Sequence, residues 1–370
     1  LILKGADERA ARVSKMKWLI LRFLLQMLVA IVCVTGVLNE TCTTTSQQVG
    51  RCVLPINCEY ALKILRSTYI SDEEWYYLHN NKCGTIREGR IPKPLICCPV
   101  VSNVPSCGVS VNNRIFGGEE TAFGEIPWAG LIRYKVGKNR FAAKCGCTLL
   151  NSRWVLTAAH CITSVPSSWK LHRVVFSEWN ANKRAPCNPE VTETKQCRKE
   201  YSIEEHIIHP MFERDSLSMR HDLAMIKTET AVEFDDYVKP ICLPFSNRIQ
   251  ELPIDGELFT VTGWGQTELD NNSGIQRHVE VFGKNNSVCD KAFVPLGITL
   301  TEDQICVGGE RGKDSCRGDS GGSLTRQDGL INYIVGIVSL GAQKCGTKDH
   351  PGVYTKVANY LDWIEEVMIA

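Results

Sequence analysis

Three short motifs carry the residue types that nucleophilic catalysis needs. Leu156–Cys161 reads LTAAHC and contains His160, Asp222 lies in the stretch HDLAMI, and Ser320 lies in DSCRGDSGG. A serine hydroxyl is a poor nucleophile at neutral pH and needs a base positioned beside it. Each motif alone is modest evidence, because a single histidine or aspartate is usually structural. Together, in the order histidine, aspartate, serine, they indicate one catalytic constellation.

The three motifs closely resemble those of the chymotrypsin-like serine proteases, and the resemblance covers residues 115–370. It implies that His160 takes the proton from Ser320, and that Asp222 orients the imidazole and stabilises its cation. The backbone N–H groups of Gly318 and Ser320 would face the developing oxyanion, where one donor commonly contributes about 3 kcal/mol.

The same resemblance implies a specificity. Asp314 lies six residues before the serine, where the family has the floor of its primary pocket, so cleavage after arginine or lysine is expected. Ser315 would help to bind the substrate cation, and Gly341 and Gly352 would keep the pocket walls open. Ser339 belongs to a strand that resembles the one that binds the substrate backbone. The alternative is that Asp314 is a surface aspartate.

A zymogen activation site is also implied. The sequence RIFGG at Arg114–Gly118 resembles the bond whose cleavage activates these enzymes. A cut after Arg114 by another trypsin-like protease would free the amine of Ile115. That amine would pair with Asp319 and organise the oxyanion hole and the pocket. The alternative is that Arg114 is an ordinary linker arginine.

Composition excludes some functions. The chain has 370 residues, and its 42 lysines and arginines nearly balance 41 acidic residues, which gives no support to a nucleic-acid-binding protein. Its 18 cysteines favour an oxidising compartment and a disulfide framework. Zinc is the rival interpretation, but the paired motifs of zinc sites are lacking in the sequence.

The N-terminal sequence predicts export. Residues 1–15 precede the first methionine, Met16, and are interpreted as a non-native upstream segment. Residues 16–36 combine a basic start, an apolar stretch and small residues, which predicts a signal peptide and a secreted protein of an extracellular, haemolymph-like fluid. The alternative is a signal anchor, but the cleanest apolar run is shorter than the ~20 residues of a membrane span. Sequons that could carry glycans begin at Asn39, Asn271 and Asn285.

Two domains are expected. Residues 42–98 contain six cysteines and are too few for a large core, so cross-links must stabilise them. This segment, with its linker at 99–114, resembles the clip domain of arthropod serine proteases. From residue 115 onward, short apolar runs between turn residues predict an all-β domain, and helical spacing near the end predicts a C-terminal helix. The resemblance specifies two β-barrels for this peptidase domain, 115–370.

A disulfide pattern is implied by the resemblance, because counting cysteines cannot choose among the pairings. The implied bonds are Cys42–Cys97, Cys52–Cys83, Cys58–Cys98, Cys107–Cys242, Cys145–Cys161, Cys187–Cys197, Cys289–Cys306 and Cys316–Cys345. The bond from Cys107 would span the cut after Arg114 and keep the N-terminal piece attached. Cys147 is left over, and we expect a buried, inert thiol in preference to an intermolecular bond.

Calcium is the one cofactor that the resemblance raises, since relatives often bind it in the loop after the position of Glu178. Glu178 and Asn180 suit that role, whereas Lys183 and Pro186 stand where further ligands would be. We therefore expect no required cofactor and assign no metal site.

These expectations combine into a secreted zymogen that cleaves other proteins after arginine or lysine in an extracellular cascade of innate immunity. The cascade would be prophenoloxidase activation with melanisation, or processing of the Toll ligand. Implied partners are a zymogen or cytokine precursor as substrate, a trypsin-like activator and a serpin, with no nucleic acid and no membrane after signal removal. The alternatives are a membrane-anchored trypsin-like protease and a non-catalytic clip-domain adaptor, which would lack part of the triad.

Overall fold

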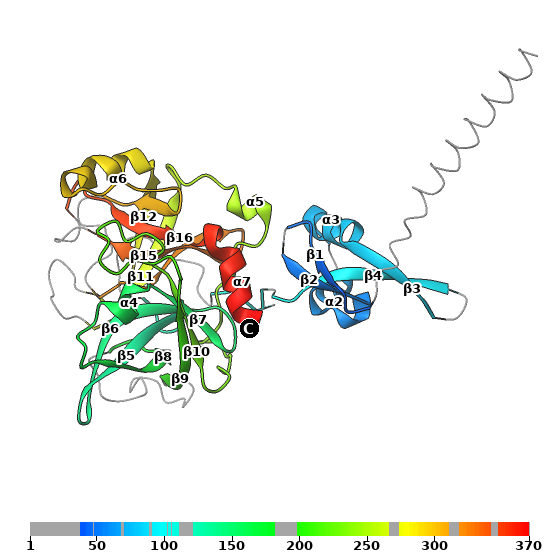
Figure 1. Ribbon diagram of the computed structural model, residues 1–370, viewed down its shortest axis with the longest axis horizontal. Coiled ribbons are helices and arrows are strands. Elements are labelled where there is room, and N and C mark those ends of the chain that lie inside the picture. The colour runs from blue at the N-terminus through cyan, green and yellow to red at the C-terminus, as the bar shows by residue number, and fades with distance from the viewer. Residues whose placement is uncertain are drawn as a thin grey trace, which may run out of the picture. The chain divides into compact units, whose positions relative to one another are not determined.

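The chain forms two compact units that meet in the sequence between Val100 and Val101, and we describe each by itself in this computed structural model (Figure 1). The structure describes residues 38–46, 48–67, 70–88, 91–101, 103–104, 106–110, 121–181, 198–265, 274–310, 318–341 and 347–369. Several expectations fall outside these residues. They are the upstream segment and signal peptide, Arg114, Ile115, Asn271, Asp314, Ser315 and the bonds Cys187–Cys197 and Cys316–Cys345. Among the described residues, no helix is long and apolar enough to cross a membrane.

The N-terminal unit is built on an antiparallel sheet in the order β1-β2-β4-β3. Its strands are β1 (Thr41–Thr43), β2 (Val49–Val53), β3 (Lys82–Glu88) and β4 (Ile91–Pro99), and between β2 and β3 lie η1 (Pro55–Asn57), α2 (Glu59–Arg66) and α3 (Asp72–Asn80). A capping box starts α3: the Ser71 hydroxyl accepts the Glu74 N–H at 3.2 Å, and the Glu74 carboxylate accepts the Ser71 N–H at 2.9 Å.

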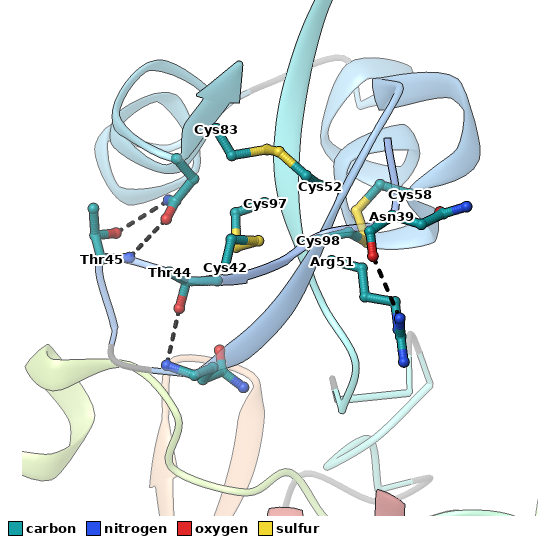
Figure 2. Close-up of a disulfide and its surroundings, with 12 residues drawn as sticks. Asn39, Cys42, Thr44, Thr45, Arg51, Cys52, Cys58, Cys83, Cys97 and Cys98 are labelled. Atoms are coloured by element: carbon teal, nitrogen blue, oxygen red, sulfur yellow. Dashed lines mark hydrogen bonds between the residues drawn. A yellow bond between two sulfur atoms is a disulfide. The ribbon is translucent and has the colours of Figure 1, made fainter. Parts of the chain in front are cut away.

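Three disulfides hold this small unit together (Figure 2). They join Cys42 to Cys97, Cys52 to Cys83 and Cys58 to Cys98. Neighbouring side chains of a strand point to opposite faces, so Cys97 and Cys98 cross-link β4 on both faces of the sheet. The apolar core is correspondingly small and consists of Cys58, Ala61, Ile64, Tyr77 and Ile96. Each disulfide typically adds about 2–4 kcal/mol to the free energy of unfolding, and so compensates for the small core.

The second unit contains two closed β-barrels, which confirms the all-β fold expected for it (Figure 1). The first runs in the order β10-β7-β6-β5-β8-β9, with β5 (Ala129–Gly137), β6 (Arg140–Leu149), β7 (Trp154–Thr157), β8 (Lys170–Phe176), β9 (Lys199–Ile208) and β10 (Ala224–Thr228). The second runs in the order β11-β12-β13-β16-β15-β14, with β11 (Leu258–Gly263), β12 (Arg277–Lys284), β13 (Gln304–Val307), β14 (Ser323–Asp328), β15 (Ile331–Leu340) and β16 (Gly352–Lys356).

Short helices connect and close the barrels. They are α4 (His160–Thr163), α5 (Asn247–Gln250), α6 (Asn286–Phe293), η2 (Val294–Leu296), η3 (Val357–Tyr360) and α7 (Leu361–Ile369). The C-terminal helix α7 buries Leu361, Ile364 and Val367, at the predicted helical spacing. These side chains share one apolar cluster with Val155 and Ile226 of the first barrel, although α7 follows the second barrel in the sequence.

Disulfides also brace the second unit. They join Cys107 to Cys242, Cys145 to Cys161, and Cys289 to Cys306. Cys147 is buried and outside any disulfide, and burial raises the pKa of its thiol above the ordinary value. A neutral buried thiol of this kind is chemically inert.

Candidate active site

Strand pairing brings His160 and Asp222 together. His160 follows β7 and Asp222 precedes β10, and these antiparallel strands pair Thr157 with Ala224, so the end of one strand meets the start of the other. His160 Nδ1 lies 2.7 Å from Asp222 Oδ2, and the His160 backbone N–H donates to Asp222 Oδ1 at 2.9 Å. The aspartate therefore holds both the ring and the main chain of the histidine.

The second barrel completes the surroundings of Asp222, whose side chain is fully buried. Ser339 of β15 donates its hydroxyl to Asp222 Oδ2 at 2.5 Å, and Thr355 of β16 donates to the Asp222 carbonyl at 3.0 Å. A buried carboxylate needs such donors, because an unpaired charge in the interior is costly. Ser339, expected at the substrate strand, thus uses its side chain to support the aspartate.

Ser320 lies beside the same histidine segment. Its carbonyl accepts the Gly146 N–H at 2.8 Å, and Gly146 follows Cys145, which is disulfide-bonded to Cys161. Gly321 has φ +78°, and a side chain there would collide with Thr157 Oγ1 and the Gly146 carbonyl. The tight turn is therefore possible only because residue 321 is glycine.

The structure brings the backbones of the histidine and serine segments together without a hydrogen bond between their side chains, as judged over the described residues. His160 Nε2 has Cys161 Sγ at 4.0 Å. Catalytic hydrogen bonds are often long or poorly aligned without substrate, so the missing bond does not argue against a catalytic role for the pair. Cys145, His160 and Cys161 also offer ligand atoms within 4.8 Å of one another, but the disulfide removes both thiolates, so this group does not suit a metal.

Comparison with known proteins decides the family. The family described as "Trypsin" matches residues 115–364, and "Regulatory CLIP domain of proteinases" matches residues 42–98. The chain belongs to the clip-domain serine proteases of the trypsin family. It is 44% identical over 333 residues to "CLIP domain-containing serine protease B15" of Anopheles gambiae, covering 89% of this chain and 91% of that protein.

Other relatives have names that refer to particular pathways. "Melanization protease 1" of Drosophila melanogaster is 33% identical over 368 residues, covering 88% of this chain and 92% of that protein. The crystal structure of the Drosophila Grass clip serine protease of the Toll pathway matches with a TM-score of 0.60 and 26% identity, covering 90% of this chain and 98% of that chain.

In this clip-domain protease, Asp319 is buried next to the serine. Its Oδ1 accepts the Gly265 N–H at 2.7 Å, and a side chain at Gly263 would collide with the same carboxylate. Gly318 has φ +107°, and a Cβ there would lie 2.9 Å from the Gly265 Cα. Gly265 thus packs against both Asp319 and Gly318, which links the buried acid to the expected oxyanion donors.

The two glycines expected at the pocket walls lie at neighbouring ends of two paired strands. Strands β15 and β16 pair Leu340 with Val353; Gly341 directly follows β15, and Gly352 is the first residue of β16. A side chain at Gly341 would meet nothing within 4 Å and would enter open space. Asp314 and Ser315, expected at the floor, lie outside the described residues.

Sequence reasoning missed a ring cluster behind Asp222. His221, which precedes it, has φ +55°, stacks on His209 at a centroid distance of 5.3 Å, and has Nδ1 3.0 Å from the Tyr360 hydroxyl. Burial, aided by His221, lowers the pKa of His209 to about 4. The left-handed backbone conformation of His221 is uncommon for residues other than glycine, although histidine adopts it more often than most. No local sequence pattern indicates that its ring would meet His209 and Tyr360.

Proposed function

We propose that this clip-domain serine protease is a secreted zymogen that, once activated, hydrolyses proteins after arginine or lysine, with His160, Asp222 and Ser320 as its triad. The observation that carries the proposal is the buried Asp222, which holds both the ring and the backbone of His160. Because Asp222 engages Nδ1, the other ring nitrogen, Nε2, is left to serve as the base.

The chemistry is acyl transfer in two steps. Ser320 Oγ attacks the scissile carbonyl while His160 takes the hydroxyl proton, and His160 then returns that proton to the leaving amine as the carbon–nitrogen bond breaks. Water repeats the sequence on the acyl-enzyme, which releases the acid and regenerates Ser320. The N–H groups of Gly318 and Ser320 stabilise the negative oxygen of each tetrahedral intermediate.

Activation proceeds by a cut after Arg114, made by another trypsin-like protease. The new Ile115 amine pairs with Asp319. The burial of Asp319 against Gly265, and the packing of Gly265 on Gly318, support this proposal, because a charge bound at Asp319 is thereby coupled to the oxyanion donors.

Specificity follows from Asp314 at the pocket floor, assisted by Ser315. The open space at Gly341 supports the entry of a long side chain. A buried substrate cation requires a carboxylate partner, so Asp314 selects arginine and lysine.

The biological setting is an extracellular cascade of innate immunity. The relatives named for melanisation and for the Toll pathway support it. The substrate is a downstream zymogen or cytokine precursor, a serpin acts as inhibitor, and the clip domain docks partners. Asn39 and Asn285 are exposed, as glycan acceptors must be.

Active-site labelling tests the proposal. The purified chain is cut after Arg114 and treated with a fluorophosphonate, which forms a covalent bond only with an activated serine. We expect labelling at Ser320 in the cut form, with little in the uncut form and none in Ser320→Ala. Confirmed cleavage without labelling would instead show a non-catalytic adaptor.

A further inference from the structure

Two carboxylates and three guanidinium groups form a network on strands β5, β8 and β9 of the first barrel and just beyond them. The strand pair β8–β9 matches Phe176 with Lys199, so Glu178 and Arg198 meet just beyond its end. Arg198 Nη1 lies 3.4 Å from Glu178 Oε2, and Arg198 Nε lies 3.0 Å from Glu200 Oε1. The side chains of Arg198 and Glu178 are only 14% and 9% exposed, so little solvent screens this contact.

Further cations surround the second carboxylate. Arg133 Nη1 lies 2.8 Å from Glu200 Oε1, and Arg173 Nη1 lies 3.0 Å from Glu200 Oε2. With Glu178 and Arg198, the described network holds three positive and two negative groups, a net charge of +1. A divalent cation would be repelled by this arrangement.

All three oxygen atoms of Glu178 already accept N–H groups. Oε2 faces Arg198, Oε1 accepts the Asn180 N–H at 3.3 Å, and the backbone carbonyl accepts Trp264 Nε1 at 3.0 Å. Burial raises the pKa of Glu178, and Arg198 opposes that shift by favouring the anion. Calcium requires six to eight oxygen ligands, about 2.3–2.6 Å away, and here the oxygens are turned toward donors.

We infer that Arg198 is the built-in cation of this loop and takes the place at Glu178 that the family resemblance gives to calcium, so that the site binds no calcium. The guanidinium neutralises the buried carboxylate and ties the start of β9 to the end of β8. It does so without dependence on the calcium concentration of the surrounding fluid.

The position of this cation matters because Glu178 and Trp179 make hydrogen bonds to segments that lie next to Asp319 and near the start of the peptidase domain. The Glu178 carbonyl accepts the indole N–H of Trp264. Gly265, which follows Trp264 in the chain, donates its backbone N–H to the Asp319 carboxylate. Trp179 donates its indole N–H to the Thr121 carbonyl at 2.9 Å. Glu178 and its internal cation therefore anchor the segments around Asp319 and the start of the peptidase domain.

Terbium luminescence tests the metal half of the inference on the full chain. Tb³⁺ binds calcium sites and emits when a nearby tryptophan is excited, and Trp264 directly contacts the Glu178 carbonyl. We expect no saturable emission from the wild type at Tb³⁺ concentrations up to about 10 mM. That limit lies above the dissociation constants of weak extracellular calcium sites, which are about 10⁻⁴–10⁻³ M. Saturable emission that Ca²⁺ displaces would overturn the inference.

Thermal unfolding of Arg198→Gln tests the role of Arg198. The matched control is Arg173→Gln, which also removes one positive charge beside Glu200 but leaves the pair of Arg198 with Glu178 intact. We expect Arg198→Gln to lower Tm by roughly 5 °C or more, and Arg173→Gln by no more than about 2 °C. Arg198→Lys should recover part of the loss, and Ca²⁺ should not change the wild-type Tm. Equal losses in the two glutamine variants, or a wild-type Tm raised by Ca²⁺, would refute the inference. If Arg198→Gln does not fold, the wild-type titrations decide.

Discussion

At the scale of single residues, Asp222 depends on groups that lie far away in the sequence. Its carboxylate binds His160 through both oxygens and receives the Ser339 hydroxyl, so a fully buried charge keeps three donors. Without these donors the carboxylate would be left unpaired in the interior, which is costly, and it would no longer be held in place beside the histidine.

Ser339→Ala should therefore weaken both stability and catalysis. Removing one donor from a buried charge costs about 1–3 kcal/mol, and we expect kcat to fall roughly 10-fold. Ser323→Ala is the control, because the buried Ser323 hydroxyl has no hydrogen-bond partner within the described part of the chain. Urea unfolding and steady-state kinetics measure both effects, and equal behaviour of the two variants would contradict the role of Ser339.

Asp314→Ser should remove the preference for arginine and lysine. Without its carboxylate partner the substrate cation is buried unpaired, so kcat/KM for an arginyl substrate should fall on the order of 100-fold or more. Asp255→Ser removes an exposed aspartate and should change nothing. An unaltered cleavage profile in Asp314→Ser, read from the new N-termini of a protein substrate, would show that the pocket is assigned wrongly.

At the scale of elements, the turn before β10 is held by rings from other segments. His221 stacks on His209, and Tyr360 and Trp363 contact the His209 ring edge-on from the C-terminal segment. His209 is 8% exposed, so its ring stays neutral over most of the accessible pH range.

This cluster should make stability depend on pH. The folded pKa of His209, about 4, lies below its ordinary value of 6.5, so the unfolded chain binds the proton more readily. Neutral His209 therefore contributes about 1–3 kcal/mol to the free energy of unfolding above pH 6.5. This contribution is lost as the pH falls toward 4. His209→Gln should flatten the urea-derived stability curve in that window, while the exposed control His206→Gln should not. A wild-type slope retained in His209→Gln would exclude this origin.

At the scale of the whole molecule, a covalent and hydrogen-bonded tether joins the linker to the peptidase domain. Cys107 is bonded to Cys242, and the side-chain amide of Asn103 exchanges two hydrogen bonds, of 2.8 and 2.7 Å, with the backbone of Leu243. Gly108 also donates to the Pro240 carbonyl at 2.8 Å. The part of the linker that contains Asn103, Cys107 and Gly108 thus belongs structurally to the second unit.

Cleavage after Arg114 should therefore leave the clip-containing piece attached. On a denaturing gel the cut protein should run as one species without reductant and as two with it, because Cys107 and Cys242 lie on either side of the cut. The Cys107→Ser, Cys242→Ser double variant should separate without reductant. Separation of the cut wild type under non-reducing conditions would show that the bond does not form in the mature protein.

The sequence by itself determined the family, the fold class and the identity of the candidate triad. The motifs around His160, Asp222 and Ser320 are recognisable because tight turns and reactive groups restrict the residues that can surround them. The C-terminal helix was also predictable, because the spacing of Leu361 and Ile364 is a local signal. Neither feature requires knowledge of distant contacts.

Only the tertiary structure decided what surrounds those groups. The Ser339 hydroxyl reaches Asp222 across 117 residues, His221 meets Tyr360 across 139, and Arg198 meets Glu178 beyond a strand pair. Polar side chains choose such partners through strand register and burial, and neither can be inferred from the residues next to them in the chain.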